Sequence, residues 1–266
     1  MTQRVSFKVY LSYLVIFVAF LGLWKFVIFI FDYPTFVLPS PESIARELFV
    51  GLANGLFIKH AYVTFLETVL GFTMGGAFGV ILGYAFGKFP RVELLFSPYI
   101  IALQTVPKVA LAPLLVLWFG YGLGSKIVIA GLITFFVLFV NVMVGVRSVE
   151  TNMINLMRSI KANAWQFFLL VEVPHSLPMI FAGAKAGITL AIIGAIVGEF
   201  MGSKEGLGYL LVWASGQFDM PLIVASVVIL TLMGLGLYKI IALLERFFLS
   251  WHVSYVRLQV GDIKTI

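Results

Sequence analysis

Six apolar runs divide this chain, and each is long enough to cross the hydrocarbon core of a bilayer as a helix of about twenty residues. They lie at 9–31, 61–87, 94–119, 126–146, 177–200 and 221–243. With 61% hydrophobic and only 11% charged residues, the composition lies far outside the range of soluble domains. The sequence therefore predicts an all-α membrane protein with about six transmembrane helices in one domain, residues 1–266. The first run is too long for a signal-peptide core, so we expect it to be retained as a span.

The basic residues predict the orientation of the spans. An even number of spans puts both termini on one side, and short cytoplasmic loops are enriched in Lys and Arg. If that side is the cytoplasm, ten basic residues lie inside: Arg4, Lys8, Lys88, Arg91, Arg147, Arg158, Lys161, Arg246, Arg257 and Lys264. Four lie outside: Arg46, Lys59, Lys126 and Lys204. Both termini and the 147–176 loop are thus predicted to be cytoplasmic. The scattering of these charges argues against nucleic acid as a partner.

The outer loop at 32–60 carries a second helical pattern. Pro39-Ser40-Pro41-Glu42 supplies a plausible helix start. A helical stripe of apolar residues follows at Ile44, Leu48, Leu52 and Leu56. We expect this helix to lie on the membrane surface.

Small residues repeat along the second and fifth spans, and such faces let helices approach closely in lipid. The second span has a glycine at every fourth position: Gly71, Gly75, Gly79, Gly83 and Gly87. The fifth carries Gly183, Gly187 and Ala191, then Gly194, Gly198 and Gly202. These two spans are predicted to form the packed centre, although such ladders carry no information about a transported solute.

Several polar residues occur within the apolar runs. Pro107 and Pro113 predict a bend in the third span, near Gln104 and Lys108. An intramembrane charge favours a translocation pathway or an ion pair, and the candidate pathway residues are Glu67, Gln104, Lys108, Asn141 and Glu199. The alternatives are that Glu67 and Lys108 snorkel to an interface, as expected for Lys185, and that Glu199 caps or braces an outer loop.

The 147–176 loop reads as two short amphipathic helices. Met153, Met157 and Ile160 share a face with Leu156 beside it, and a second helix runs through Trp165, Phe168 and Val171. Asn163 and Gln166 have capping-box spacing, and Pro174 is expected to end the second helix. Such a pair could fill a hydrophobic groove on a partner or lie flat on the membrane.

This loop resembles the cytoplasmic signature of ATP-binding-cassette (ABC) importer permeases, written EAA, three residues, G, nine residues, I, any residue, LP. Val171, Val173 and Pro174 match its tail, whereas Asn155, Leu156 and Met157 replace Glu-Ala-Ala and Lys161 replaces the glycine. Other segments resemble the nitrate, sulfonate and taurine branch, which includes importers of thiamine-pyrimidine precursors and riboflavin. They are 36–41, 104–110, 113–114, 118–120, 181–185, 198–200 and 206–209.

The resemblance implies a type I ABC importer permease in a bacterial inner membrane. Its implied partners are a second permease copy or a related chain, ATPase subunits that bind ATP and Mg, and an extracytoplasmic binding protein that delivers a small organic or anionic solute. This chain would have no enzymatic activity and no cofactor, and it has no phosphate-binding loop. The implied ATPase contacts are Asn155, Leu156, Met157, Lys161, Trp165, Phe167, Phe168, Val171, Val173 and Pro174.

The alternative function is a stand-alone ion-coupled transporter, which favours inverted repeats and paired charges near the membrane centre. No convincing repeat occurs. The sequence also has no cysteine and only three histidines, which argues against a metal site or a cysteine nucleophile. Since selection in such importers is expected to rest with the binding protein, the sequence predicts a class of solute and no single compound.

Overall fold

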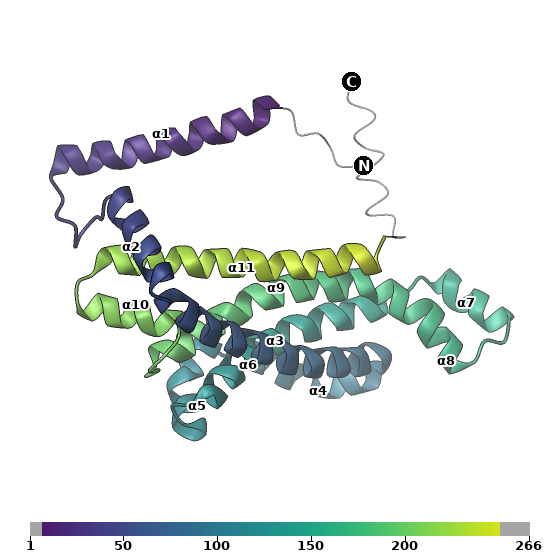
Figure 1. The fold of residues 1–266 in the computed structure, drawn as a ribbon. Coiled ribbons are helices and arrows are strands. Elements are labelled where there is room, and N and C mark those ends of the chain that lie inside the picture. Colours follow the sequence, from purple (N-terminus) through teal and green to yellow (C-terminus); the bar gives the residue numbers. More distant parts are fainter. Residues whose placement is uncertain (1–6, 251–266) are drawn as a thin grey trace.

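The computed structural model describes residues 7–250, and every regular element in that range is helical (Figure 1). The termini, with Arg4, Arg257 and Lys264 of the charge argument, lie outside the described residues. The helices are α1 (Phe7–Phe31), α2 (Pro41–Ala53), α3 (Leu56–Lys88), α4 (Pro90–Thr105), α5 (Ala112–Phe119), α6 (Leu123–Arg147), α7 (Thr151–Ser159), α8 (Ala164–Phe167), α9 (Val173–Phe200), α10 (Leu207–Gly216) and α11 (Met220–Phe248). A 3₁₀ turn, η1 (Lys108–Leu111), precedes α5, and a π-helical turn, η2 (Phe168–Glu172), joins α8 to α9.

The expectation of about six spans is confirmed. Five helices, α1, α3, α6, α9 and α11, are long and apolar enough to cross a membrane, and α4 with η1 and α5 forms a sixth, broken span bent by 78°. The break follows from Pro107, which favours an extended conformation for the preceding residue. Val106 has that conformation, with φ −62° and ψ 126°. The predicted bend is therefore present, and it divides the span into two short helices.

The outer segment folds as predicted into a helix, with a shift at its end. Ser40 caps α2 by accepting a hydrogen bond from the Ser43 amide at 3.2 Å, and Pro41 occupies the first turn. Leu56, expected in this helix, instead begins α3. Trp24 of α1 donates to the Pro39 carbonyl oxygen at 3.1 Å, while most of α1 is exposed and lies apart from the bundle in Figure 1.

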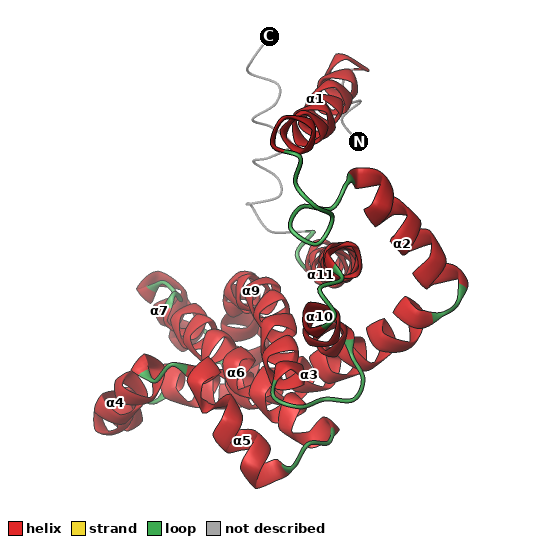
Figure 2. Cartoon of the chain, turned by 90° about the vertical axis from the view of Figure 1, so that its left-hand side faces the viewer, coloured by secondary structure: helices red, strands yellow, loops and turns green. Residues whose placement is uncertain are grey.

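The central helix of the bundle is α6, which corrects the expectation that the second and fifth spans form the centre. All five ladder glycines of α3 pack against α6, at Ala130, Gly131, Phe135, Phe139 and Val146 among others. On α9, Gly183, Gly194 and Gly198 pack against the same helix at Asn141, Ala130 and Lys126. The glycines of both helices thus pack against α6, and Figure 2 shows α6 beside α3 and α9.

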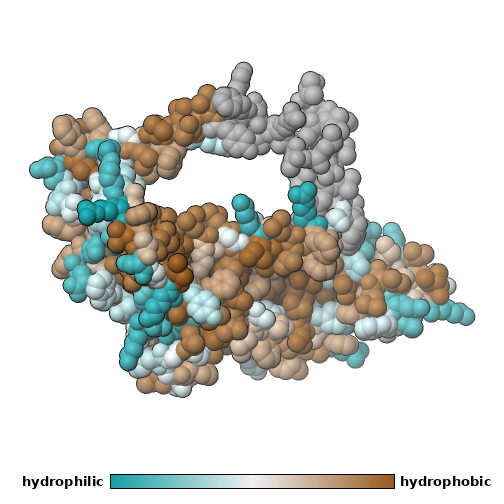
Figure 3. Space-filling model, viewed as in Figure 1, coloured by the Kyte–Doolittle hydropathy of each residue, from teal (hydrophilic) through white to brown (hydrophobic). Residues whose placement is uncertain are grey.

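The surface has an apolar middle and polar ends. In Figure 3 the brown surface follows the long helices, and teal residues gather over α2 and at the α7–α8 tip. The two polar ends of the bundle are therefore the α2/α10 end and the α7/α8 end. This distribution is that of a membrane-spanning bundle whose two ends meet water.

Candidate functional site

The α7–α8 loop projects from one end of the bundle as two short helices (Figure 1). The capping box expected at the second helix is confirmed. The backbone amide of Gln166 donates to the side-chain oxygen of Asn163 at 2.8 Å. The backbone amide of Asn163 donates in return to the side-chain oxygen of Gln166 at 2.8 Å. Two amides that begin α8 are thereby satisfied, so the turn into this short helix is fixed by its own residues.

Among the polar residues of this loop, several large apolar side chains are exposed. Leu156 is 55% exposed, and Ile160 and Trp165 are each 64% exposed. Leu169 and Leu170, which sequence reasoning did not select, are exposed as well. Of the residues expected to contact an ATPase, Asn155 and Lys161 are exposed, Phe167, Phe168, Val173 and Pro174 are partly buried, and Met157 and Val171 are buried inside the chain. Met157 and Val171 therefore support the loop from within, and Leu156, Ile160 and Trp165 are its most exposed apolar side chains on the two short helices and the turn between them.

The backbone conformation of Lys161 explains why the family signature has a glycine at this position. Its φ of 53° lies in the left-handed region, where a side chain costs about 1 kcal/mol or more relative to glycine. The Lys161 amide donates to the Arg158 carbonyl oxygen at 3.0 Å, so the conformation belongs to the end of α7.

Lys161→Gly is expected to stabilise the loop by about 1 kcal/mol, because glycine adopts this conformation without a Cβ penalty. Amide hydrogen exchange across 151–167 measures the effect as slower exchange. Glycine at Arg158, inside α7, is the control and should speed exchange. If Lys161→Gly exchanges as fast as the unmodified chain or faster, the backbone at Lys161 is not strained.

The prolines at the end of the loop behave differently from the prediction. Pro174 does not end the second helix: α8, η2 and α9 form one continuous run, Ala164–Phe200. Pro174 lies in the first turn of α9 and Pro178 lies inside that helix. The π-helical turn ends at Glu172, two residues before Pro174, and it widens the helix close to the point where proline lacks an amide to donate.

The bend in the broken span holds Gln104 and Lys108. The Lys108 ammonium donates to the Gln104 carbonyl oxygen at 2.6 Å and lies 4.7 Å from the centre of the Phe136 ring. It therefore caps the last turn of α4 and contacts an aromatic face of α6. The Gln104 side chain is exposed.

Glu199 and Glu67 meet at the α2/α10 end, and the bracing role considered for Glu199 is the one its contacts support. Glu199 is 1% exposed and accepts from the Thr64 hydroxyl at 2.6 Å and from the Gly208 amide. Glu67 is fully buried, which excludes snorkelling, and it lies on α3 three residues after Thr64, the residue that bonds Glu199. Within residues 7–250 the Glu67 oxygens accept no hydrogen bond. A pocket of about 570 Å³, with Glu67 and Lys126 among its lining residues, opens at this end.

Asn141, the remaining pathway candidate, lies away from Glu67 and Glu199. Asn141 donates to the Val137 carbonyl oxygen of its own helix at 2.8 Å, and its Cβ packs where Gly183 leaves room. Lys185, expected to snorkel, forms a 2.7 Å ion pair with Glu245 of α11. The five pathway candidates therefore occupy three separate regions, and their role in a pathway stays a prediction.

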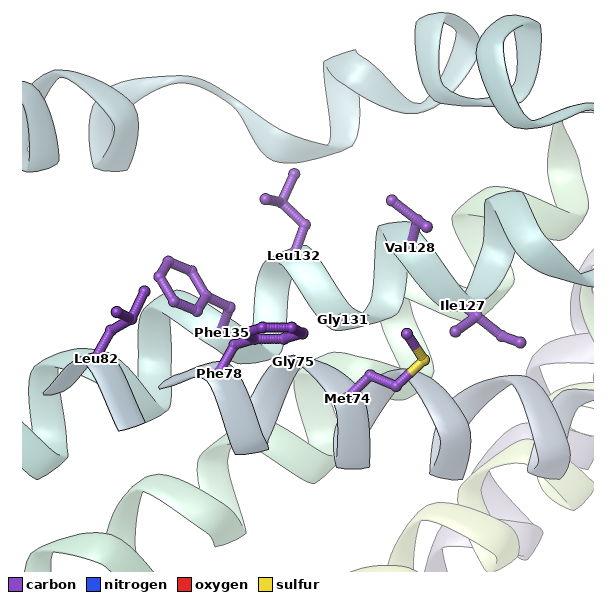
Figure 4. Close-up of a pocket in the computed structure, with 9 residues that line it drawn as sticks. All are labelled: Met74, Gly75, Phe78, Leu82, Ile127, Val128, Gly131, Leu132 and Phe135. Carbon is purple, nitrogen blue, oxygen red and sulfur yellow. The ribbon is translucent and has the colours of Figure 1, made fainter. Parts of the chain in front are cut away.

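An apolar pocket lies between α3 and α6, where Gly75 and Gly131 bring the helices together (Figure 4). Its volume is about 390 Å³. Its lining consists of Met74, Gly75, Phe78, Leu82, Ile127, Val128, Gly131, Leu132 and Phe135. None of these side chains is a hydrogen-bond donor, so the pocket suits an apolar neighbour better than a charged solute.

Comparisons with known proteins agree with this geometry. The riboflavin transport system permease protein RibX of Chloroflexus aurantiacus is 39% identical over 231 residues, 87% of this chain and 86% of the relative. The formylaminopyrimidine transport permease protein ThiX of Halalkalibacterium halodurans is 36% identical over 216 residues, 81% of this chain and 86% of the relative. A putative aliphatic sulfonates transport permease protein SsuC of Bacillus subtilis is 32% identical over 219 residues, 82% of this chain and 79% of the relative.

Solved structures share the fold. A methionine ABC transporter in inward-facing conformations matches with a TM-score of 0.57 at 18% identity, covering 79% of this chain and 98% of that chain. An amino acid ABC transporter matches with a TM-score of 0.58 at 18% identity, covering 75% and 97%. The model of the binding-protein-dependent transport system inner membrane component matches residues 75–250. The chain therefore belongs to this family, the permeases of ABC transporters.

Proposed function

We propose that this chain is the transmembrane permease subunit of an ATP-driven ABC importer in the bacterial inner membrane. The α7–α8 loop and both termini would be cytoplasmic, since the loop lies at the end richer in Lys and Arg. Two permeases, as a homodimer or with a related chain, would form the pathway. An extracytoplasmic binding protein would deliver the solute, and separate ATPase subunits would bind ATP and Mg.

The observation that carries the proposal is the exposure of three large apolar side chains on the α7–α8 loop, Leu156, Ile160 and Trp165. Apolar side chains at the water-facing end of a membrane bundle are costly unless a partner covers them. Their place on two short helices suits a groove on a soluble subunit. Trp165 also stacks on Phe168 at 5.4 Å between ring centroids, which holds the indole in one orientation.

The relatives support a class of solute. Their names refer to riboflavin, formylaminopyrimidine and aliphatic sulfonates, which are small organic and in part anionic compounds. We propose a solute of this class, comprising sulfonate, taurine or nitrate and pyrimidine- or riboflavin-like compounds.

The test is purification of the tagged chain in mild detergent, with bound subunits identified by mass spectrometry and ATP hydrolysis measured. A nucleotide-binding subunit should copurify with ATPase activity. Trp165→Asp should weaken its binding by about 2 kcal/mol or more, because a buried aromatic anchor would be replaced by a charge. Titration of the variant with the purified ATPase measures this loss.

The matched control is Phe218→Asp at the opposite end. Phe218 is 75% exposed and has a φ of 57°, a conformation that Asp tolerates. This variant should bind the ATPase like the unmodified chain. A folded chain that binds no ATPase, and carries solute without one, would overturn the proposal in favour of a stand-alone ion-coupled transporter.

A further inference from the structure

The two ends of the α7–α8 loop are bonded to neighbouring parts of the bundle, the last turn of α3 and the first turn of α4. At the start of the loop, Arg147 ends α6. Its guanidinium donates to Glu93 Oε1 at 2.8 Å and also pairs with Glu93 Oε2, and it donates to the Phe86 carbonyl oxygen at 3.0 Å. This forked contact fixes both position and direction of the two groups. It joins α6 to the end of α3 and the first turn of α4.

At the other end of the loop, Glu172 makes the corresponding contact. It is the last residue of η2 and is 4% exposed. One carboxylate oxygen accepts from the Tyr84 hydroxyl at 2.7 Å, and the other pairs with the Lys88 ammonium. A buried carboxylate left without its cation is strongly unfavourable, so α3 and the start of α9 are held together here.

An aromatic cluster extends this second contact to the exposed face of the loop. Lys88 Nζ lies 5.1 Å from the centre of the Phe167 ring. Tyr84 meets Phe168 edge to face at 5.3 Å, and Phe168 stacks on Trp165. Trp165, the proposed anchor for the ATPase, is thus connected to Glu172 and Lys88 through one layer of rings.

The Arg147–Glu93 pair holds the first turn of α4 directly, and the Glu172–Lys88 pair holds the last turn of α3, which precedes it. No residue of α4 is buried, so this helix lacks the packing that holds α3 on α6. Beyond α4 the chain bends by 78° into η1 and α5. A force applied to the loop would therefore reach a loosely packed helix that leads into the broken span.

We propose that the ion pairs Arg147–Glu93 and Glu172–Lys88 form a clamp that transmits movement of the α7–α8 loop to α4 and the broken span. Arg147 and Glu172 are then positioning residues: they act through α4 and need not touch solute or nucleotide. The inference rests on the proposed function, because it assumes that an ATPase moves the loop. Glu172 occupies the unspecified position of the family signature, so that signature does not include this contact.

The test uses the absence of cysteine from the chain, which makes an introduced cysteine a unique reporter. Tyr99→Cys places it on α4, at a residue that is 67% exposed. In the purified complex with its ATPase, the rate of maleimide labelling is measured with and without ATP and Mg²⁺. Adding ATP and Mg²⁺ should change the labelling rate about tenfold. Glu172→Lys should reduce that change to less than about twofold, while ATPase binding and nucleotide-free labelling are retained.

Exchanging the charges of an ion pair distinguishes the loss of that pair from a general loss of structure. Adding Lys88→Glu to Glu172→Lys restores opposite charges and should restore most of the nucleotide-dependent change. The same is expected when Glu93→Arg is added to Arg147→Glu. Glu172→Gln, which still offers Tyr84 an acceptor oxygen, is the milder variant if the reversals misfold, and it should lower the change as well.

The control is another partly buried ion pair, Lys185–Glu245, which joins α9 to α11 away from the loop. Glu245→Gln should leave the labelling change at Tyr99→Cys intact. If no ATPase copurifies, the proposed function fails. If the ATPase binds and hydrolyses ATP, and Glu172→Lys and Glu172→Gln still show the full labelling change, the clamp alone is overturned.

Discussion

Gly75→Leu is expected to lower the free energy of unfolding by at least about 3 kcal/mol, the upper part of the range for overpacked sites. A Cβ atom at Gly75 would lie 2.7 Å from the Gly131 Cα and overlap the Gly131 carbonyl group. The obstacle is backbone, so no side-chain rotation can relieve it, and α3 and α6 must separate. SDS-induced unfolding of the purified chain, followed by tryptophan fluorescence, measures the loss.

The matched control is Gly22→Leu. Gly22 is also a glycine inside a candidate span, α1, but a Cβ atom there meets nothing within 4 Å. Helix propensity favours leucine at both positions by about 1 kcal/mol, so only packing distinguishes the two variants. Equal unfolding midpoints for Gly75→Leu and the unmodified chain would show that α3 and α6 do not cross here.

The spans and the bend were predictable from the sequence because their causes are local. A run of apolar residues must be helical in lipid whatever surrounds it, and Pro107 prevents a continuous helix through Val106. The glycine ladder of α3 also predicted a packed face correctly. Its partner could not be read from the sequence, because the facing residues of α6 include Phe139 and Val146, which have no repeating signature.

The ion pairs were missed for a different reason. Arg147 and Glu93 are 54 positions apart, and Lys88 and Glu172 are 84 apart, so only the folded helices bring them together. Single charges near span ends are typical of interfacial residues that snorkel, so no local feature indicated the Lys185–Glu245 pair either. One signal was available: Glu172 is an acidic residue between Val171 and Val173, a position where a charge in an apolar segment indicates a partner.

The π-helical turn is the feature least accessible from the sequence. Pro174 ends helices in most contexts, and the prediction followed that rule. Here the wider turn of Phe168–Glu172 lets the helix continue into α9, and it also places Glu172 beside α3. Such turns are rare and often lie at functional sites.

Glu199→Ala is expected to destabilise the fold by about 3 kcal/mol, because a buried carboxylate that satisfies two donors would be removed. The donors are the Thr64 hydroxyl on α3 and the Gly208 amide in the first turn of α10. Thr64 in turn accepts from the Leu207 amide at 2.8 Å. Without Glu199 these groups are left unsatisfied around a cavity, so α10 should detach from α3. Amide exchange across 206–216 and the SDS unfolding midpoint measure the two effects.

The control is Glu205→Ala at the same end. Glu205 forms a 2.7 Å pair with Lys59, but the two side chains are 47% and 63% exposed, and exposed pairs contribute little to stability. Lys59 lowers the pKa of Glu205, so the pair is charged at neutral pH and its contribution should weaken with added salt. Comparable losses from the two variants would place the support of α10 in the surface pair. A large loss from Glu199→Ala alone would place it in the buried contacts that Glu199 makes with α3 and α10.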